Sequence, residues 1–362
     1  MSNADIKILS IKPRAIELEL VQPLETSSGL FKTWPLVLVD IHTSQGVVGH
    51  SFVNCFLRML VKPLVHLLTD MSTILSGSSL SPIDLDRKLK SINRLIGTRG
   101  TLGTAVSMVE IAAWDALAKS KELPLACLLG SAPRALPVYK TIITMDPTKA
   151  AQMSHDAMKK GYGGVKCKLG HPDEENDLNL IHEIQQACGT KFPLMADYNQ
   201  ALDAPEVMRR IRKIDDMGLV WIEEPTDAND FAGHARIADS TNTPISMGEN
   251  WRSPAEASQC LNMFGSDYAM PDLVNIGGIS AWQQTAFLCE LRGVPVSSHA
   301  YPETCAHIMA GCANAHWLEH VDFFDNLFIK PLQPTNGTFC PSQDPGIGIG
   351  WNEQLISKCL IA

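Results

Sequence analysis

The chain has 362 residues, of which 45% are hydrophobic and 19% charged, as in a soluble globular protein large enough for two cored units. Its formal net charge of −9 excludes the basic surface that nucleic acid or an anionic membrane would need as a main partner. We expect a cytoplasmic protein with reduced thiols, because it has no bilayer-length apolar run, no signal-peptide core and no CxxC pair among its 10 cysteines.

Residues 1–133 predict an α+β capping domain. Short apolar runs at 15–18, 35–41 and 46–49 favour an antiparallel meander of strands. The stretch from 57 to 129 carries apolar positions at helical spacing. Between the first two strands, residues 25–34 are polar, aromatic and glycine-containing, which predicts a loop able to close over a pocket.

Residues 134–325 predict an α/β unit, a TIM-type (β/α) barrel. Short β-branched runs alternate there with amphipathic stretches, as in repeated βα units. The eight strand candidates are 138–144, 164–169, 193–199, 219–224, 244–249, 268–273, 294–299 and 316–319. Eight such units close a barrel whose strands all end at one mouth. The remaining segment, 326–362, is loop-rich, and we expect it to pack back on the first domain.

Three carboxylates, Asp197, Glu223 and Glu249, end three consecutive predicted strands at equal intervals. Each alone is easily explained as a helix cap or a surface residue, but three at one repeat interval would repel one another unless a cation lay between them. A ligand set made only of oxygens favours Mg²⁺, with Mn²⁺ possible, over zinc. Asn199 shares the face of Asp197, so it could support the metal or the substrate.

Candidate proton-transfer groups end the other strands. Lys166 and Lys168 face the same side of the second strand. Their repulsion, a nearby metal and partial burial should lower the pKa of Lys168 until it can accept a proton. His299 ends the seventh strand beside Asp272, which should orient the imidazole and raise its basicity. Glu319 has apolar neighbours that should keep it protonated and able to donate to a negative oxygen. Away from a barrel mouth, two lysines spaced in this way are usually solvated at the surface. A lone barrel histidine is usually a packing residue.

This set of groups suits removal of a proton next to a carboxylate. The enolate so formed needs the metal and Glu319 to offset its charge. With Lys168 and His299 on opposite faces, the proton can return from the other side, which racemises a 2-hydroxy acid. A hydroxyl on the next carbon could instead leave as water after protonation by His299, as in an acid-sugar dehydratase that forms a 2-keto-3-deoxy acid. A non-catalytic barrel that binds a metal and a ligand is the third hypothesis.

Over nearly its full length the chain resembles the mandelate racemase subgroup of the enolase superfamily, the mandelate racemase/muconate lactonizing enzyme family. The motifs that carry the resemblance lie at 165–168, 197–200, 221–225, 247–250, 270–272, 297–299 and 316–319. The resemblance implies Asp197, Glu223 and Glu249 as metal ligands and Lys168 and His299 as the two bases. It implies Asp272 as the partner of His299 and Glu319 as the electrophile. It also implies a small carboxylate substrate and a homo-oligomer.

The chain departs from mandelate racemase in the specificity region of the first domain, where mandelate racemase is more uniformly apolar. Residues expected to bind substrate there, together with two from the barrel, are Ser28, Phe31, Lys32, Asn54, Phe56, Thr141 and Asn199. Lys32 and Asn54 would suit a polar or doubly anionic hydroxy acid. Phe31 and Phe56 would still accept an aromatic ring, so the substrate stays open at this point.

Overall fold

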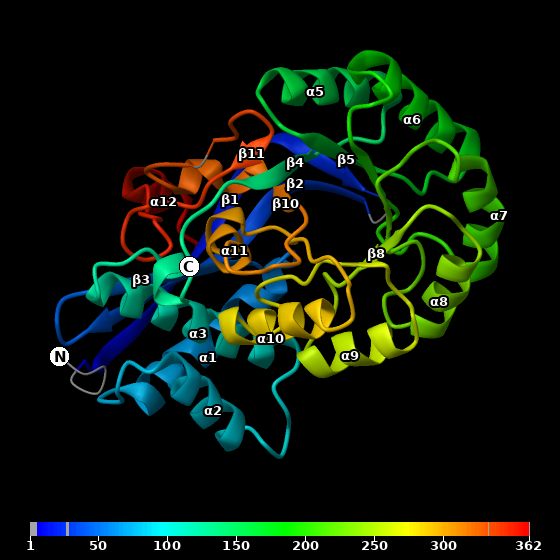
Figure 1. The fold of residues 1–362 in the computed structure, drawn as a ribbon. Helices are drawn as coiled ribbons and strands as arrows, with labels where there is room; N and C mark the ends of the chain where they lie inside the picture. The colour runs from blue at the N-terminus through cyan, green and yellow to red at the C-terminus, as the bar shows by residue number, and fades with distance from the viewer. Residues whose placement is uncertain (1–5, 27–28, 332, 362) are drawn as a thin grey trace.

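The computed structural model describes residues 6–26, 29–331 and 333–361 (Figure 1). The first domain begins with an antiparallel sheet in the order β1-β2-β3, which confirms the predicted meander. Its strands are β1 (Ile8–Thr26), β2 (Gly29–Thr43) and β3 (Val48–Asn54). The loop predicted for 25–34 is wrong, because Glu25 and Leu24 pair with Leu30 and Phe31 and the two strands continue almost to the hairpin tip.

Helices follow the sheet, as the sequence predicts. They are η2 (Arg58–Leu60), α1 (Val61–Leu75), α2 (Pro82–Ile92), α3 (Gly100–Ser120) and α4 (Leu125–Leu128). Helix α3 is buried on almost every side, because it contacts strands β2 and β3 as well as a helix of the second unit. It therefore joins the first domain to the barrel.

The second unit is a curled parallel sheet of seven strands in the order β10-β4-β5-β6-β7-β8-β9. The strands are β4 (Leu136–Thr141), β5 (Gly164–Lys168), β6 (Leu194–Asp197), β7 (Ile222–Glu223), β8 (Ile245–Met247), β9 (Tyr268–Ala269) and β10 (Leu318–His320). In place of the seventh predicted strand, Val296 makes isolated parallel bridges to Ala269 and Ala315, and His299 bridges to Asp272. These bridges link β9 to the segment that leads into β10.

Helices cover the outside of this sheet, and Figure 1 shows them as an arc from α5 to α10. They are α5 (Pro147–Lys159), α6 (Glu174–Cys188), α7 (Ala204–Ile214), α8 (Phe231–Asp239), α9 (Pro254–Asn262), α10 (Ile279–Glu290) and α11 (Pro302–Met309). Several begin with an acidic or hydroxyl cap; for example, the Asp203 side chain accepts the N–H of Glu206 at the start of α7. Such caps set where each helix starts after its strand.

The C-terminal segment contains η3 (Asp322–Leu327), β11 (Thr338–Phe339) and α12 (Glu353–Cys359). It contacts the first domain: Trp351 Nε1 donates to Asp40 at 2.7 Å, and the N–H of Ile361 donates to the carbonyl of Ala15 at 3.0 Å. Strand β11 pairs antiparallel with β4. Within the described ranges, every helix is too short or too polar to cross a bilayer.

Candidate active site

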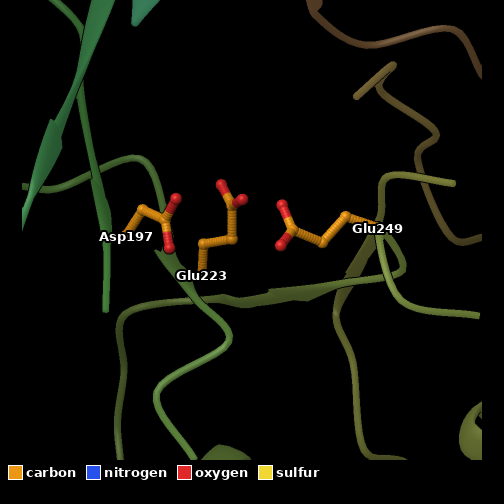
Figure 2. Close-up of side chains that lie close together, drawn as sticks. All are labelled: Asp197, Glu223 and Glu249. Atoms are coloured by element: carbon orange, nitrogen blue, oxygen red, sulfur yellow. The ribbon is translucent and has the colours of Figure 1, made fainter. Parts of the chain in front are cut away.

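Three carboxylates lie in a row at the mouth of the barrel. Asp197 and Glu223 end β6 and β7, Glu249 follows β8, and one oxygen of each lies within 4.8 Å of the others. Figure 2 shows Glu223 between the other two. Gly248 turns the chain into Glu249 with a φ of +138°, at a point where a side chain would meet Met270. We call these three carboxylates the acidic row.

The acidic row fits a hard divalent cation. Burial, followed by the charge of Asp197, raises the pKa of Glu223 to about 8, which shows how unfavourable the clustered charges are by themselves. A dication relieves this repulsion, and an all-carboxylate donor set is of the kind that Mg²⁺ prefers. The structure therefore brings together the three residues that the sequence indicates as ligands.

Lys166 and Lys168 point from β5 toward the acidic row. Lys166 Nζ lies 2.8 Å from both Glu223 Oε2 and Glu319 Oε1, and Lys168 Nζ lies 2.6 Å from Asp197 Oδ2. The expected depression of the Lys168 pKa counted on a cation in the acidic row, and among the protein groups alone the direction is the opposite. Burial and the charge of Lys166 both disfavour the Lys168 ammonium. The carboxylates of Asp197, Glu223 and Glu249 outweigh them, so the pKa of Lys168 is raised.

His299 lies at the other end of the acidic row. Its Nδ1 is 2.8 Å from Asp272 Oδ2, and its Nε2 is 3.0 Å from Glu249 Oε2. The second oxygen of Asp272 accepts the N–H groups of Val274 and Asn275 at 2.9 and 2.8 Å, so this carboxylate is fixed. Burial disfavours the imidazolium, yet Glu249 and Asp272 together raise the pKa of His299 well above its ordinary value.

Glu319 is held from three sides. Thr141 Oγ1 donates to Oε1 at 2.5 Å, the N–H of Ala300 donates to Oε2 at 2.8 Å, and Lys166 forms the ion pair described above. The expectation of a protonated Glu319 is wrong here. Burial would raise the pKa of Glu319, but the Lys166 ammonium and His299 lower it below its usual range. The apolar neighbours in the sequence are outweighed by cations that come from other strands.

Asn199 lies beside the first carboxylate of the row, in a left-handed backbone conformation with a φ of +44°. Its backbone N–H donates to Asp197 Oδ1 at 2.7 Å and its Nδ2 donates to Asp197 Oδ2 at 3.1 Å. Asn199 and Thr141 both line the cavity above the row. Asn199 therefore fixes the orientation of Asp197 and reaches the space that a substrate would fill.

A cavity of about 620 Å³ lies between the acidic row and the first domain. The barrel contributes Lys168 and His299 to its lining, and the first domain contributes Phe31, Asn54 and Phe56. Phe31 stacks on Trp34 with ring centroids 5.3 Å apart, and Phe56 meets the same indole edge-on at 5.4 Å. These rings form an aromatic wall within a lining that also holds aliphatic and polar side chains.

Two predicted substrate residues are not found in this lining. Lys32 is exposed and does not line the cavity, whereas Phe31 and Trp34 on the same strand do. Ser28 lies outside the described residues. The structure therefore does not place a Lys32 cation in the cavity, and its contact with substrate stays a prediction.

The cavity also contains residues that the sequence interpretation missed. Arg252 and Asn250 follow Glu249 and line the cavity, and Phe323 follows Glu319 and packs 5.9 Å from Trp34. All three lie within four residues beyond a predicted strand end. A search of every loop that follows a predicted strand would have found them, because these loops build the sites of such barrels.

Comparisons with known proteins agree with this arrangement. Residues 149–355 match the enolase C-terminal domain-like family, and residues 11–130 match the N-terminal domain of mandelate racemase/muconate lactonizing enzymes. The chain belongs to the mandelate racemase/muconate lactonizing enzyme family. As a member of this family in the enolase superfamily, it is an enzyme, and its cofactor is Mg²⁺, the metal found in several structures of its relatives.

Three relatives illustrate the range of this family. The L-talarate/galactarate dehydratase of Salmonella typhimurium is 34% identical over 279 residues, which cover 75% of this chain and 70% of the relative. An enolase superfamily protein from Bradyrhizobium, crystallised with magnesium and mandelic acid, is 35% identical with a TM-score of 0.95 over 99% of both chains. The L-talarate dehydratase of Polaromonas, with magnesium and L-glucarate, is 28% identical with a TM-score of 0.91, covering 99% of this chain and 98% of that one.

Proposed function

We propose that this enzyme racemises a 2-hydroxy acid whose side chain is aromatic or otherwise apolar. The observation that carries the proposal is the position of the two bases at opposite ends of the acidic row. Lys168 contacts Asp197 at one end, and His299 contacts Glu249 at the other. Glu223 lies between them (Figure 2). A substrate carboxylate bound over the row would have one base on each side of its α-carbon.

Each base has one role in each direction of the reaction. One base starts without its proton and takes the α-proton, and the other starts protonated and delivers a proton to the opposite face. Mg²⁺ held by the acidic row would supply Lewis-acid stabilisation of the charge that develops on the substrate carboxylate. Lys166, fixed by Glu223 and Glu319, adds a permanent positive charge beside the same oxygens.

The aromatic wall supports the choice of substrate class. Phe31, Trp34, Phe56 and Phe323 line the cavity, whereas Lys32 is exposed outside it. Such a surface favours a ring or an alkyl group over a hydroxylated chain. The Bradyrhizobium relative was crystallised with mandelic acid, which is an aromatic 2-hydroxy acid.

Exchange of the α-proton tests the proposal. Each enantiomer of mandelate, and then of ring-substituted and aliphatic 2-hydroxy acids, is incubated with the enzyme and MgCl₂ in D₂O. We expect the α-proton signal in the NMR spectrum to disappear and the optical rotation to fall to zero, and we expect EDTA to stop both. If no 2-hydroxy acid exchanges its α-proton, the proposal is overturned.

An acid-sugar dehydratase is the second candidate, because Arg252 lines the cavity together with Asn250 and Asn275. Arg252 Nη2 lies 3.4 Å from Asn250 Oδ1, and its guanidinium would be available to bind a second carboxylate of a sugar diacid. The similarity to dehydratases of talarate and galactarate supports the same idea. Formation of a 2-keto product from an acid-sugar library, detected with semicarbazide, would favour this candidate over the racemase.

Both candidates have a small carboxylate as the binding partner, and we propose no nucleic acid or membrane partner. A homo-oligomer stays a prediction that rests on the family. Light scattering after size-exclusion chromatography checks it, and a particle of the monomer's mass, 39.6 kDa, would contradict it.

A further inference from the structure

The strand that carries Lys168 loses one of its neighbours before it reaches that residue. The paired register of β5 with β4 ends at Lys166, which lies opposite Thr141. On the other side, the pairing with β6 continues to Lys168 and Asp197, and the N–H of Leu169 donates to the carbonyl of Asp197 at 2.8 Å. The backbone of Lys168 is therefore held by the sheet on one side.

A turn of three residues, 170–172, follows Leu169. Gly170 has a φ of +101°, a backbone conformation that residues with a side chain rarely adopt. The N–H groups of Gly170 and His171 donate to the carboxylate of Asp177 at 3.0 to 3.2 Å. The carbonyls of His171 and Pro172 accept from Arg210 Nη1 at 2.7 Å and Nη2 at 3.1 Å. Two side chains thus bind four backbone groups of one turn.

Asp177 and Arg210, which we call the clamp, come from two different helices, α6 and α7. Their exposed fractions are 3% and 7%, and Arg210 Nη1 lies 3.5 Å from Asp177 Oδ2. Arg210 Nε also donates to Glu206 Oε1 at 2.7 Å. A buried and fully bonded network of this kind holds one arrangement, and removal of one member leaves a buried charge without its partner.

We propose that Asp177 and Arg210 are positioning residues for the Lys168 base. The clamp fixes the turn that follows β5, and through it the place from which the flexible lysine side chain reaches Asp197. The proposal rests on the proposed racemase function, because Lys168 and His299 then serve opposite enantiomers. A shift of about 1 Å in a reacting group can cost roughly a hundredfold in rate, so an effect on Lys168 should be measurable.

Exchange of each enantiomer, measured separately, isolates the Lys168 side. Both enantiomers of mandelate with MgCl₂ in D₂O are given to the wild type, to Arg210→Gln and to Arg209→Gln. Arg209 is the matched control, because it is the next residue of α7 and also pairs with Glu206, but it is exposed to solvent. In Arg210→Gln we expect exchange of the enantiomer whose α-proton faces Lys168 to fall about tenfold or more, and exchange of the other to change less than about twofold.

The ratio of the two exchange rates does not depend on how much of the enzyme is folded, so general destabilisation leaves it unchanged. Asp177→Asn, which keeps the size of the side chain, should shift the ratio in the same direction as Arg210→Gln. Equal loss for both enantiomers, or the same shift in Arg209→Gln, overturns the inference, as does failure of both clamp variants to fold. If the wild type exchanges neither enantiomer, the racemase proposal itself fails, which is a distinguishable result.

Discussion

The two ends of the acidic row hold their bases in different ways. Lys168 belongs to a regular strand and contacts Asp197, a member of the row itself. His299 belongs to a segment joined to the barrel by isolated bridges, and the next two residues, Ala300 and Tyr301, have φ values of +48° and +47°. The imidazole also contacts the row, through Glu249, but it is oriented by Asp272, which stands outside the row.

This difference suggests that one base is placed by its backbone and the other by its side-chain partner. An imidazole has two nitrogens in fixed directions, so a bond from Asp272 to Nδ1 determines where Nε2 points. A lysine ammonium sits on four rotatable carbons and has no such fixed direction. Its position depends more strongly on where the strand ends, which is the property that the clamp controls.

Removal of either base should have the largest effect. We expect Lys168→Ala and His299→Asn each to lower the rate of racemisation by about 10² to 10⁴, the usual contribution of a general acid or base. Each variant should still exchange the α-proton of one enantiomer, and the two variants should retain opposite ones. NMR in D₂O measures this exchange. If both variants retain the same enantiomer, the bases do not act from opposite faces and the comparison fails.

The next largest effect should come from Glu319, which lies near both bases. Its oxygens are bonded to Lys166, Thr141 and Ala300, so Glu319→Gln keeps the shape of the side chain and removes its charge. We expect kcat to fall by roughly 10² to 10³. Because the ionised Glu319 would act by holding Lys166 beside the substrate carboxylate and not on one face, both enantiomers should lose the same factor. A loss confined to one enantiomer would assign Glu319 to a single base.

Asp272→Asn should have a smaller and one-sided effect. The loss of a group that orients a histidine typically costs about 10- to 100-fold. We expect exchange of the enantiomer that faces His299 to fall, which is the opposite asymmetry to that expected for Arg210→Gln. Separate exchange measurements for the two enantiomers check this. If Asp272→Asn and Arg210→Gln lower the exchange of the same enantiomer, the two ends of the row are not held independently.

Much of the site could be predicted from the sequence, because residues at the ends of successive barrel strands lie side by side at one mouth. Asp197, Glu223 and Glu249 were recognisable at equal intervals, and the lysine pair had the period of a strand. The seventh strand was only partly predictable, since residues 294–299 form bridges instead of a regular ladder. The run of β-branched residues indicates extended chain but does not fix its pairing.

Charges and loops account for what the sequence did not predict. Among the protein groups alone, the pKa directions of Lys168 and Glu319 differ from those expected, because each depends on ions brought in from other strands. Arg252 was missed because it lies in a loop whose path no periodicity describes. The clamp joins Asp177 to Arg210, two residues on different helices that nothing in the sequence pattern links.

The smallest effect should come from the aromatic wall, which both bases share. Phe56 lines the cavity, is 56% exposed and packs edge-on against Trp34, so Phe56→Ala should leave the fold intact. The loss of one aromatic contact of about 0.5 to 1.5 kcal/mol should raise the KM for mandelate roughly two- to tenfold with little change in kcat. Lys32→Ala is the matched control, because Lys32 is exposed outside the cavity and should leave KM unchanged. A larger KM effect for Lys32→Ala than for Phe56→Ala would mean that substrate binds against the outer face of β2, and the wall would then lose its assigned role.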